Sequence, residues 1–543
     1  MKKKIFGMVM CVLLIVTAIA TAESLNSRQL TSINVAPSQG GARDSWTEEQ
    51  KIHASDGSTD DRFGFSVTLD GNTALIGAPI DDSSRGTVYV FTRTDNTWTQ
   101  QAKLSAEDGD AGDCFGHAVS LDGDTALIGA YMDDDNGFQS GSAYVFIRNG
   151  ATWTQQAKLL GLGLLERFGS SVSLSGDTAL IGAPTYNNVS GSAYVFTRTG
   201  TTWTQQQKLV GGDSAYGDGF AYAVALDGDT AVIGSPYDDD NGLNSGSVYV
   251  FTRTGTNWTQ QVKLNALDGK ILNEFGCSIF LDGDTALIGA SGAGAAYVFF
   301  WTGTHWVQRA KVTAEGDEFG CSVSLDGDTA LIGAMGVPPP PPPTIPGWAY
   351  VFVRYEDNYS KFWWQQAKLL ASDGTEEDYF GCSVSIDGNT ALIGAYGDED
   401  NGDESGSAYV FNRELENDPP FPPHIYGETH GKTGTAYPYR FTTWDPEKDK
   451  VSYYIDWGDG TTTNWTEFQP SGYPGYTENH TWNVQDTYTI RAKTKDSFGA
   501  ESGWTTLSVT MPCPINTPFM QFWEILLGRF PYAFPILRHL LGG

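Results

Sequence analysis

The sequence is poor in basic residues. It holds 33 lysines and arginines against 65 aspartates and glutamates, and its formal net charge is −32. A chain this acidic repels nucleic acid and anionic membrane surfaces through its long-range field. We therefore expect no nucleic-acid partner, and cations or partners with basic surfaces are the better candidates. The alternative is that the acidity serves only solubility or tolerance of salt.

Cysteine and histidine are also scarce. Outside the N-terminal apolar run there are five widely spaced cysteines, and the odd number argues against a disulfide framework. Three of them, at positions 277, 321 and 382, share one place in an internal repeat, so we expect small core residues there. The seven histidines show no metal-ligand spacing, and no Ser-His-Asp or Cys-His grouping stands out. We predict no catalytic or cofactor-binding residues, and hence no enzyme.

Long apolar runs are rare, and the first one has the pattern of a signal peptide. Three lysines, Lys2 to Lys4, precede the apolar run Ile5 to Ala20, which ends in the small residues Ala20-Thr21-Ala22. The run is shorter than the roughly 20 residues needed to span a bilayer. We predict a signal peptide at 1–22, a linker at 23–45 and a secreted or cell-surface location. Loss of three lysines moves the net charge from −32 to −35.

Internal repeats dominate residues 46–413. Three signatures recur seven times in fixed order: a Phe-Gly opening that runs into Leu-Asp-Gly-Asp-Thr-Ala-Leu-Ile-Gly, then Gly-Ser-Ala-Tyr-Val-Phe, then Trp-Thr-Gln-Gln-Ala-Lys-Leu. Residues 63–69 alternate between apolar and small or polar, as a half-buried strand does, and Asp-Gly pairs suit tight hairpin turns. Each unit of roughly 45 to 60 residues therefore predicts four strands, the content of one β-propeller blade.

The order of the signatures predicts how the ring closes. The Trp motif first appears at Trp46, before any Phe-Gly, and it is missing after the last copy of the second signature at Gly406. Residues 46–52 should then form the outermost strand of the last blade. Such closure leaves no open sheet edge. We predict an all-β chain whose seven-bladed β-propeller is closed by an N-terminal strand.

These residues resemble the FG-GAP repeat family, which forms the propeller at the head of integrin α chains. The Phe-Gly openings and the Gly-Ala-Pro triplets at 77–79 and 182–184 are its naming features. The resemblance implies seven blades and, more loosely, a role in surface adhesion or recognition. Integrin-type repeats place a calcium loop between the first two strands of a blade. Here that connection is a short turn, which cannot supply the six to eight oxygens that calcium takes.

The loops joining the second and third strands suggest another place for a cation. These loops should lie at the same end of the ring as the connections that lead into each first strand, and both sets are rich in acids. Three of them share Asp-x-Asp-Asn-Gly, in which alternate carboxylates followed by Asn-Gly resemble the start of a calcium loop. Calcium is thus the candidate cofactor, and the candidate metal ligands are Asp133, Asp135, Asp238, Asp240, Asp398 and Asp400. The alternative is a solvated acidic turn.

A second, smaller domain follows a Pro-rich linker at 414–424. Asp456-Trp457-Gly458-Asp459-Gly460 and the later His480-Thr481-Trp482 resemble the PKD family of immunoglobulin-like β-sandwiches, and we place this domain at 425–511. The apolar tail at 512–543 is interrupted by charges and prolines, so we expect no transmembrane span. The polyproline run at 338–343 predicts a stiff extended segment in the sixth blade. It fits either a binding segment or a spacer.

Three functions fit these sequence features. The first is an extracellular or cell-surface binding and adhesion protein that takes an unknown protein or glycan ligand on its acidic loop face. The second is a structural surface-layer component, and five Asn-x-Ser/Thr sequons are compatible with a surface glycoprotein. The third is a secreted glycosidase, but the recurrent arginines Arg93, Arg198 and Arg253 should lie at the opposite, tight-turn end. Binding is the prediction.

Overall fold

The computed structural model describes residues 45–161, 163–185, 190–316, 318–336, 347–356, 361–414, 417–472 and 474–511. These residues belong to two compact units, one covering Ser45–Glu414 and the other the described residues from 417 onward. The predicted signal peptide, the polyproline run and the apolar tail lie outside the described residues, as does nearly all of the 23–45 linker. Within the described part, no helix is long and apolar enough to cross a membrane.

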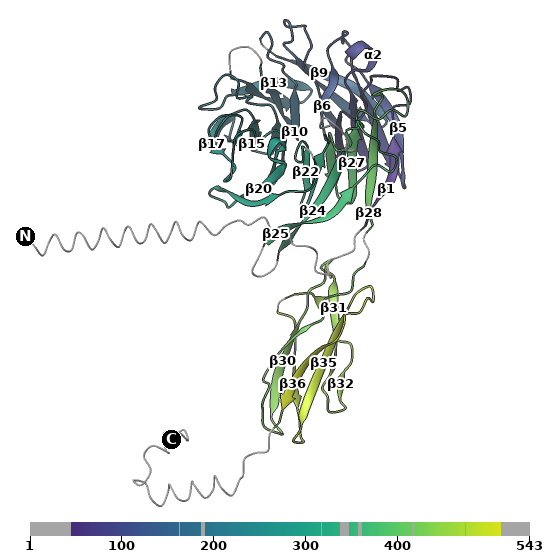
Figure 1. Ribbon diagram of the computed structural model, residues 1–543, viewed down its shortest axis with the longest axis vertical. Helices are drawn as coiled ribbons and strands as arrows, with labels where there is room; N and C mark the ends of the chain where they lie inside the picture. The colour runs from purple at the N-terminus through teal and green to yellow at the C-terminus, as the bar shows by residue number, and fades with distance from the viewer. Residues whose placement is uncertain are drawn as a thin grey trace, which may run out of the picture. The chain divides into compact units, whose positions relative to one another are not determined.

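The first unit consists of seven antiparallel four-stranded sheets arranged as a ring (Figure 1). Inner strands of neighbouring sheets contact one another around the whole ring, including β2 with β26. The first three blades are β2 (Ser66–Asp70), β3 (Thr73–Ala78), β4 (Thr87–Thr94) and β5 (Thr97–Leu104); β6 (Phe115–Asp122), β7 (Thr125–Ala130), β8 (Ser142–Asn149) and β9 (Thr152–Leu160); and β10 (Ser171–Ser175), β11 (Thr178–Ala183), β12 (Ser192–Thr199) and β13 (Thr202–Leu209).

The remaining blades repeat this pattern. The fourth to sixth are β14 (Val224–Asp227), β15 (Thr230–Ser235), β16 (Ser247–Thr254) and β17 (Asn257–Leu264); β18 (Ile279–Asp282), β19 (Thr285–Ala290), β20 (Ala295–Trp301) and β21 (Trp306–Val312); and β22 (Val323–Asp326), β23 (Thr329–Ala334), β24 (Trp348–Glu356) and β25 (Lys361–Leu369). The seventh is β26 (Val384–Asp387), β27 (Thr390–Ala395), β28 (Ser407–Glu414) and β1 (Ser45–Ile52). The described helices are short turns: α2 (Asp81–Ser84) and the 3-10 turn η1 (Ser291–Ala293).

The predicted closure of the ring is confirmed. Strand β1 pairs antiparallel with β28, from Ser45 opposite Glu414 to Ile52 opposite Ala408. Ile52 is buried in an apolar cluster that joins the last blade to the first. The N-terminal end of the propeller is thus the outer strand of its last sheet.

The propeller's hydrophobic core lies between adjacent blades. Each cluster takes side chains from the third strand of one blade and the first strands of the next. The seven phenylalanines that open the repeats, six in Phe-Gly and one in Phe-Ala, are fully buried. They pack against the Tyr and Phe of their own third strand, mostly edge-on, as Phe63 does at 5.4 Å from Tyr89 and 6.0 Å from Phe91. Such aromatic pairs add to the area that they bury. The Tyr and Phe of the second signature therefore pack against the phenylalanine of the first signature in the same blade.

The Phe-Gly motif itself is a turn in most blades, and this corrects the predicted strand at 63–69. Strand β2 begins only at Ser66, after a turn in which Gly64 has a φ of +92°. A Cβ on Gly64 would lie 2.2 Å from the carbonyl oxygen of Ser407. A Cβ on Gly394, in the last blade, would lie 1.9 Å from the carbonyl oxygen of Gly64. The two signature glycines therefore let the backbones of neighbouring blades touch.

The second unit is a β-sandwich of the PKD-like kind. One sheet is β29 (His424–Tyr426), β30 (Ala436–Thr442) and β34 (Tyr476–Thr481). The other is β32 (Thr462–Thr463), β31 (Lys450–Asp456), β35 (Thr487–Asp496) and β36 (Thr505–Thr510), with β33 (Gln469–Pro470) also paired to β31. Trp457 and Trp482 are buried between them with Tyr439 and Tyr453.

Candidate functional site: the loop end of the propeller

The connections that lead into each first strand and the loops between second and third strands lie at one end of the ring, as predicted. Backbone hydrogen bonds join them across blade boundaries. The amide of Leu165 donates to the carbonyl of Phe138 at 2.9 Å, and the amide of Leu272 donates to that of Leu243 at 2.8 Å. We call this end the loop face. A structural role does not fully explain its acidic clusters and its exposed apolar side chains.

In the second blade, the predicted metal ligands surround a lysine. The Nζ of Lys158, from β9, lies 2.9 Å from Asp108, 2.9 Å from Asp133 and 2.5 Å from Asp135. The hydroxyl of Tyr144 donates to Asp133 at 2.8 Å, and Lys158 stands 5.1 Å over the Tyr144 ring. One ammonium is thus shared by three carboxylates and an aromatic face.

The fourth and seventh blades repeat this arrangement. Lys263 contacts Asp213, Asp238 and Asp240 at 3.1, 2.8 and 2.6 Å. The seventh blade takes its lysine from the closing strand β1. Lys51 contacts Asp373, Asp398 and Asp400 at 2.9, 2.8 and 2.6 Å. The structure therefore brings each predicted Asp pair together, with an ammonium between the carboxylates.

The electrostatics of these clusters favour the charged lysine. Burial of Lys51 acts to lower its pKa, but hydrogen bonds with Asp398, Asp400 and Asp373 outweigh burial and raise the pKa. The inner acid of each pair is nearly fully buried, while the outer acid is about half exposed. Calcium binding at these pairs stays a prediction. A calcium ion would have to displace the ammonium or use the outer oxygens alone.

The other blades hold weaker versions of the cluster. Lys103 contacts Asp56 and Asp81 in the first blade, and Lys311 contacts Asp268 in the fifth. In the third, Glu166, at 3.5 Å, is the one acid that contacts Lys208 among the described residues. The lysines of the third and fifth blades have fewer acidic partners because the loops between the second and third strands of these blades contain no acids. The lysine clusters of these six blades therefore carry unequal negative charge.

Sequence reasoning missed the lysine. It belongs to the third signature and recurs in all seven copies, but the pattern does not show which end of the blade it reaches. The recurrence at positions 51, 103, 158, 208, 263, 311 and 368 was the available signal. Because a buried charge needs a partner of opposite sign, a lysine that recurs in every blade predicts an acidic partner in every blade.

Exposed apolar side chains at the loop face were also missed. Phe138 is 60% exposed and Leu243 is 61% exposed, each directly after an Asn-Gly pair. The connection that leads into the following blade lies beside each of these Asn-Gly turns. A Cβ on Gly137 would lie 2.5 Å from the Leu164 side chain, and a Cβ on Gly242 would lie 2.7 Å from the Ile271 side chain. Leu164 is 64% exposed and Ile271 is 65% exposed.

We call these two places the apolar knuckles: Phe138 with Leu164, where the second blade meets the third, and Leu243 with Ile271, where the fourth meets the fifth. At the boundary of the seventh and first blades, the corresponding residues are polar. Asp403 follows Asn-Gly there, and Thr59 lies against Gly402. The apolar character is therefore a property of one side of the ring and not a requirement of the loop fold.

An axial cavity of about 280 Å³ lies where the seven inner strands meet. The residues after each Phe-Gly or Phe-Ala line it, namely Phe65, His117, Ser170, Tyr222, Cys277, Cys321 and Cys382. Burial lowers the pKa of His117 to about 4 and raises the pKa of Cys321 to about 12. Neutral imidazole and protonated thiols are expected at pH 7, so these cysteines border the axis in their unreactive form.

The recurrent arginines do lie at the opposite end, where they are held by structural contacts. Arg198 stacks on Trp203 with its guanidinium carbon 5.3 Å from the ring centroid. Its Nε donates to Asp177 of the same blade at 2.6 Å, and one terminal nitrogen donates to Thr125 of the previous blade at 3.1 Å. These contacts tie neighbouring blades together at the end away from the loop face.

Comparison with solved structures gives three partial likenesses. The PKD domain of an M14-like peptidase from Thermoplasmatales archaeon SCGC AB-540-F20 is 48% identical, with 18% of this chain and all of that one covered and a TM-score of 0.18. A functionally unknown protein from Desulfotomaculum acetoxidans is 10% identical over 56% of this chain and 88% of that one, with a TM-score of 0.38. Apo AztD from Citrobacter koseri is 12% identical over 82% and 89%, with a TM-score of 0.29. No curated protein matches the chain.

The family comparison agrees with the blades. The FG-GAP repeat model matches seven times, over residues 46–91, 98–146, 153–196, 203–251, 258–299, 306–352 and 363–411. Each match begins at the Trp signature and ends in the third strand of the next sheet, so each spans one blade boundary. The matches cover more than half of the chain and coincide with the observed ring. The chain belongs to the FG-GAP repeat family.

Proposed function

We propose that this protein is an extracellular binding protein that holds a partner protein on the loop face of its propeller. The observation that carries this proposal is the pair of apolar knuckles. Large exposed apolar side chains gathered in a polar surround are typical of protein interaction sites. The aromatic and aliphatic side chains supply contact area, and the acidic loops around them supply charge.

The charge of the loop face supports a partner with a basic surface. Each knuckle follows an Asp-x-Asp pair, and the lysine beside that pair carries a single positive charge against three carboxylates. A partner with basic side chains around an apolar contact would match both features. Such contacts weaken with salt, because exposed charges are screened within about 8 Å at physiological ionic strength. A cell-surface location and calcium dependence are finer parts of the same proposal.

The proposal is tested with the chain from residue 23 onward on an array of extracellular proteins and glycans, with and without calcium. The variant Phe138→Ser with Leu243→Ser removes the apolar side chain from both knuckles without adding charge. It should reduce binding to basic proteins at least tenfold and leave the melting temperature unchanged. The matched control, Asn96→Ser, changes an exposed turn residue of the opposite end.

Other outcomes separate the alternatives. Unchanged binding by the double variant would contradict the loop-face proposal. Self-assembly that requires the knuckles and no second partner would favour the surface-layer component. Hydrolysis of an arrayed glycan, lost with two specific carboxylates, would favour the glycosidase.

A further inference from the structure

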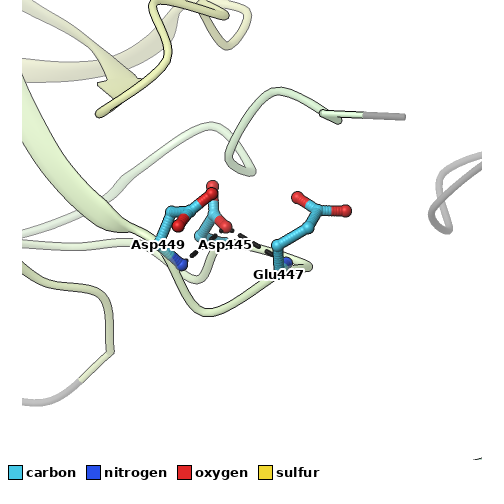
Figure 2. A group of neighbouring side chains, drawn as sticks. All are labelled: Asp445, Glu447 and Asp449. Atoms are coloured by element: carbon cyan, nitrogen blue, oxygen red, sulfur yellow. Dashed lines mark hydrogen bonds between the residues drawn. The ribbon is translucent and has the colours of Figure 1, made fainter. Parts of the chain in front are cut away.

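A separate acidic loop lies in the PKD-like unit, between β30 and β31. Asp445, Glu447 and Asp449 alternate along it with Pro446 and Lys448. Figure 2 shows the three side chains on one short loop, with dashed lines from one carboxylate oxygen of Asp445 to the backbone nitrogens of Glu447 and Asp449. Each of the three acids offers one oxygen, and these oxygens all lie within 4.8 Å of one another.

The central carboxylate is incompletely satisfied. Asp445 is fully buried. Its Oδ1 accepts hydrogen bonds from the amides of Glu447 at 3.1 Å and Asp449 at 2.9 Å. Its Oδ2 has no hydrogen-bond partner among the described residues. A buried charged oxygen without a partner is costly, and native structures rarely keep one without a reason.

A buried acid of the same unit shows what full satisfaction looks like. Asp496 is also fully buried, and its Oδ1 accepts the amides of Phe498, Gly499 and Ala500. Its Oδ2 accepts the side-chain amide of Asn417 at 2.9 Å. Both oxygens of Asp496 are therefore used. Asp445 differs because its Oδ2 has no such partner in the described part of the chain, although two further carboxylates lie nearby.

The size and chemistry of the cluster select the ligand. Carboxylate oxygens are hard ligands, which suit calcium and magnesium better than zinc. Calcium binds oxygen at about 2.3–2.6 Å, so two oxygens on one ion lie up to about 5 Å apart, whereas magnesium requires about 4.2 Å or less. Three oxygens that all lie within 4.8 Å of one another can share one calcium ion, and calcium accepts an irregular set of oxygens more readily than magnesium does.

We propose that Asp445, Glu447 and Asp449 form a site for one divalent cation of the size of calcium. The ion takes the unsatisfied oxygen of Asp445 and one oxygen from each of the other two carboxylates, with water completing its shell. It lies immediately before β31, the strand that pairs with β32, β33 and β35. Cation binding there holds the start of the central strand of the larger sheet.

The test is a calcium titration of the chain from residue 23 onward by calorimetry, with terbium luminescence as a second readout. The residue before Asp445 is Trp444, whose indole can sensitise a lanthanide bound at the site. We expect a bound ion, a rise in melting temperature with calcium, and its reversal by chelator. Asp445→Asn and Glu447→Gln should each weaken binding at least tenfold and remove terbium emission.

A matched variant separates this site from the loop face of the propeller. The triple substitution Asp135→Asn, Asp240→Asn and Asp400→Asn removes the outer acids of the three lysine clusters and should leave the proposed site intact. If Asp445→Asn does not fold, Glu447→Gln at its half-buried position decides the question. No binding up to about 10 mM calcium, well above the range of extracellular calcium modules, would overturn the proposal. So would binding that is lost only in the triple variant.

Discussion

At the residue scale, the recurring unit of this propeller is a lysine, a tyrosine and one or more acids at the loop face. The tyrosine comes from the third strand and the lysine from the fourth, so their meeting depends on the register between those strands. In the second blade this register places Tyr144 opposite Lys158. The acids then arrive from two separate loops. The ammonium therefore joins four segments, namely the third strand, the fourth strand and the two loops, so we expect the lysine to stabilise the blade.

The pH dependence of stability should reveal this ammonium. Burial acts to raise the pKa of Asp108, but hydrogen bonding to Lys158 prevails, so the pKa falls below its usual 3.8. The stabilisation is complete above pH 3.8 and is lost as the pH falls through the lowered pKa. Lys158→Met should cost about 2 kcal/mol at pH 7, and the difference from wild type should shrink below pH 3.8.

Chemical denaturation between pH 2 and pH 7 measures this difference. Lys208→Met is the matched control. Its one acidic partner among the described residues is Glu166 at 3.5 Å, so the substitution should cost less than about 1 kcal/mol. Equal losses in both variants, or a loss at position 158 that does not change with pH, would contradict the assignment.

At the element scale, blades are joined by backbone contact between the two signature glycines. The sequence predicted seven blades and their closure because both depend on the order of the repeats. It did not predict where the first strand begins, since the alternation of residues 63–69 does not report the turn at residues 63–65. The apolar knuckles were missed for a similar reason: the Asn-Gly turn is polar, and the sequence does not show that Leu164 lies beside the turn that precedes Phe138.

The candidate site could likewise be predicted only in part from the sequence. The pairing of Asp133 with Asp135 follows from alternate spacing, which a loop readily satisfies. Lys158 lies 23 residues away from Asp135 on the far strand of the sheet, and local spacing cannot report that contact. The acids at 445–449 show the same alternate spacing, but only the structure shows that one of them is buried with an unsatisfied oxygen.

A substitution between blades should be far more costly than one in a turn. Gly394→Ala would place a methyl group 1.9 Å from the carbonyl oxygen of Gly64, so the first and last blades would have to separate. We expect a loss of about 3 kcal/mol or more. The control Gly71→Ala meets no atom within 4 Å and changes only a residue with φ +56°, for about 1 kcal/mol. Urea denaturation of both variants compares them, and similar losses would disprove the close-contact explanation.

At the scale of the whole molecule, the ring is held closed by a strand from the other end of the propeller. Removing residues 45–52 should leave β28 with an unpaired edge and expose the cluster around Leu392 and Val410. We expect a loss of at least about 4 kcal/mol together with association between copies. Light scattering measures the association, and a synthetic peptide of residues 45–52 should reverse it. A monomeric, equally stable deletion variant would show that closure contributes little.

The partnership of β1 with β28 also fixes an order in time. During synthesis β1 is among the first parts of the propeller to be made, and its partner is the last, with Ser45 opposite Glu414. Six blades can assemble from neighbouring segments while the seventh waits for a pairing of very large sequence separation, which is slow to form. A propeller interrupted before β28 is thus left with an exposed strand at each end, and the complete ring marks a finished propeller.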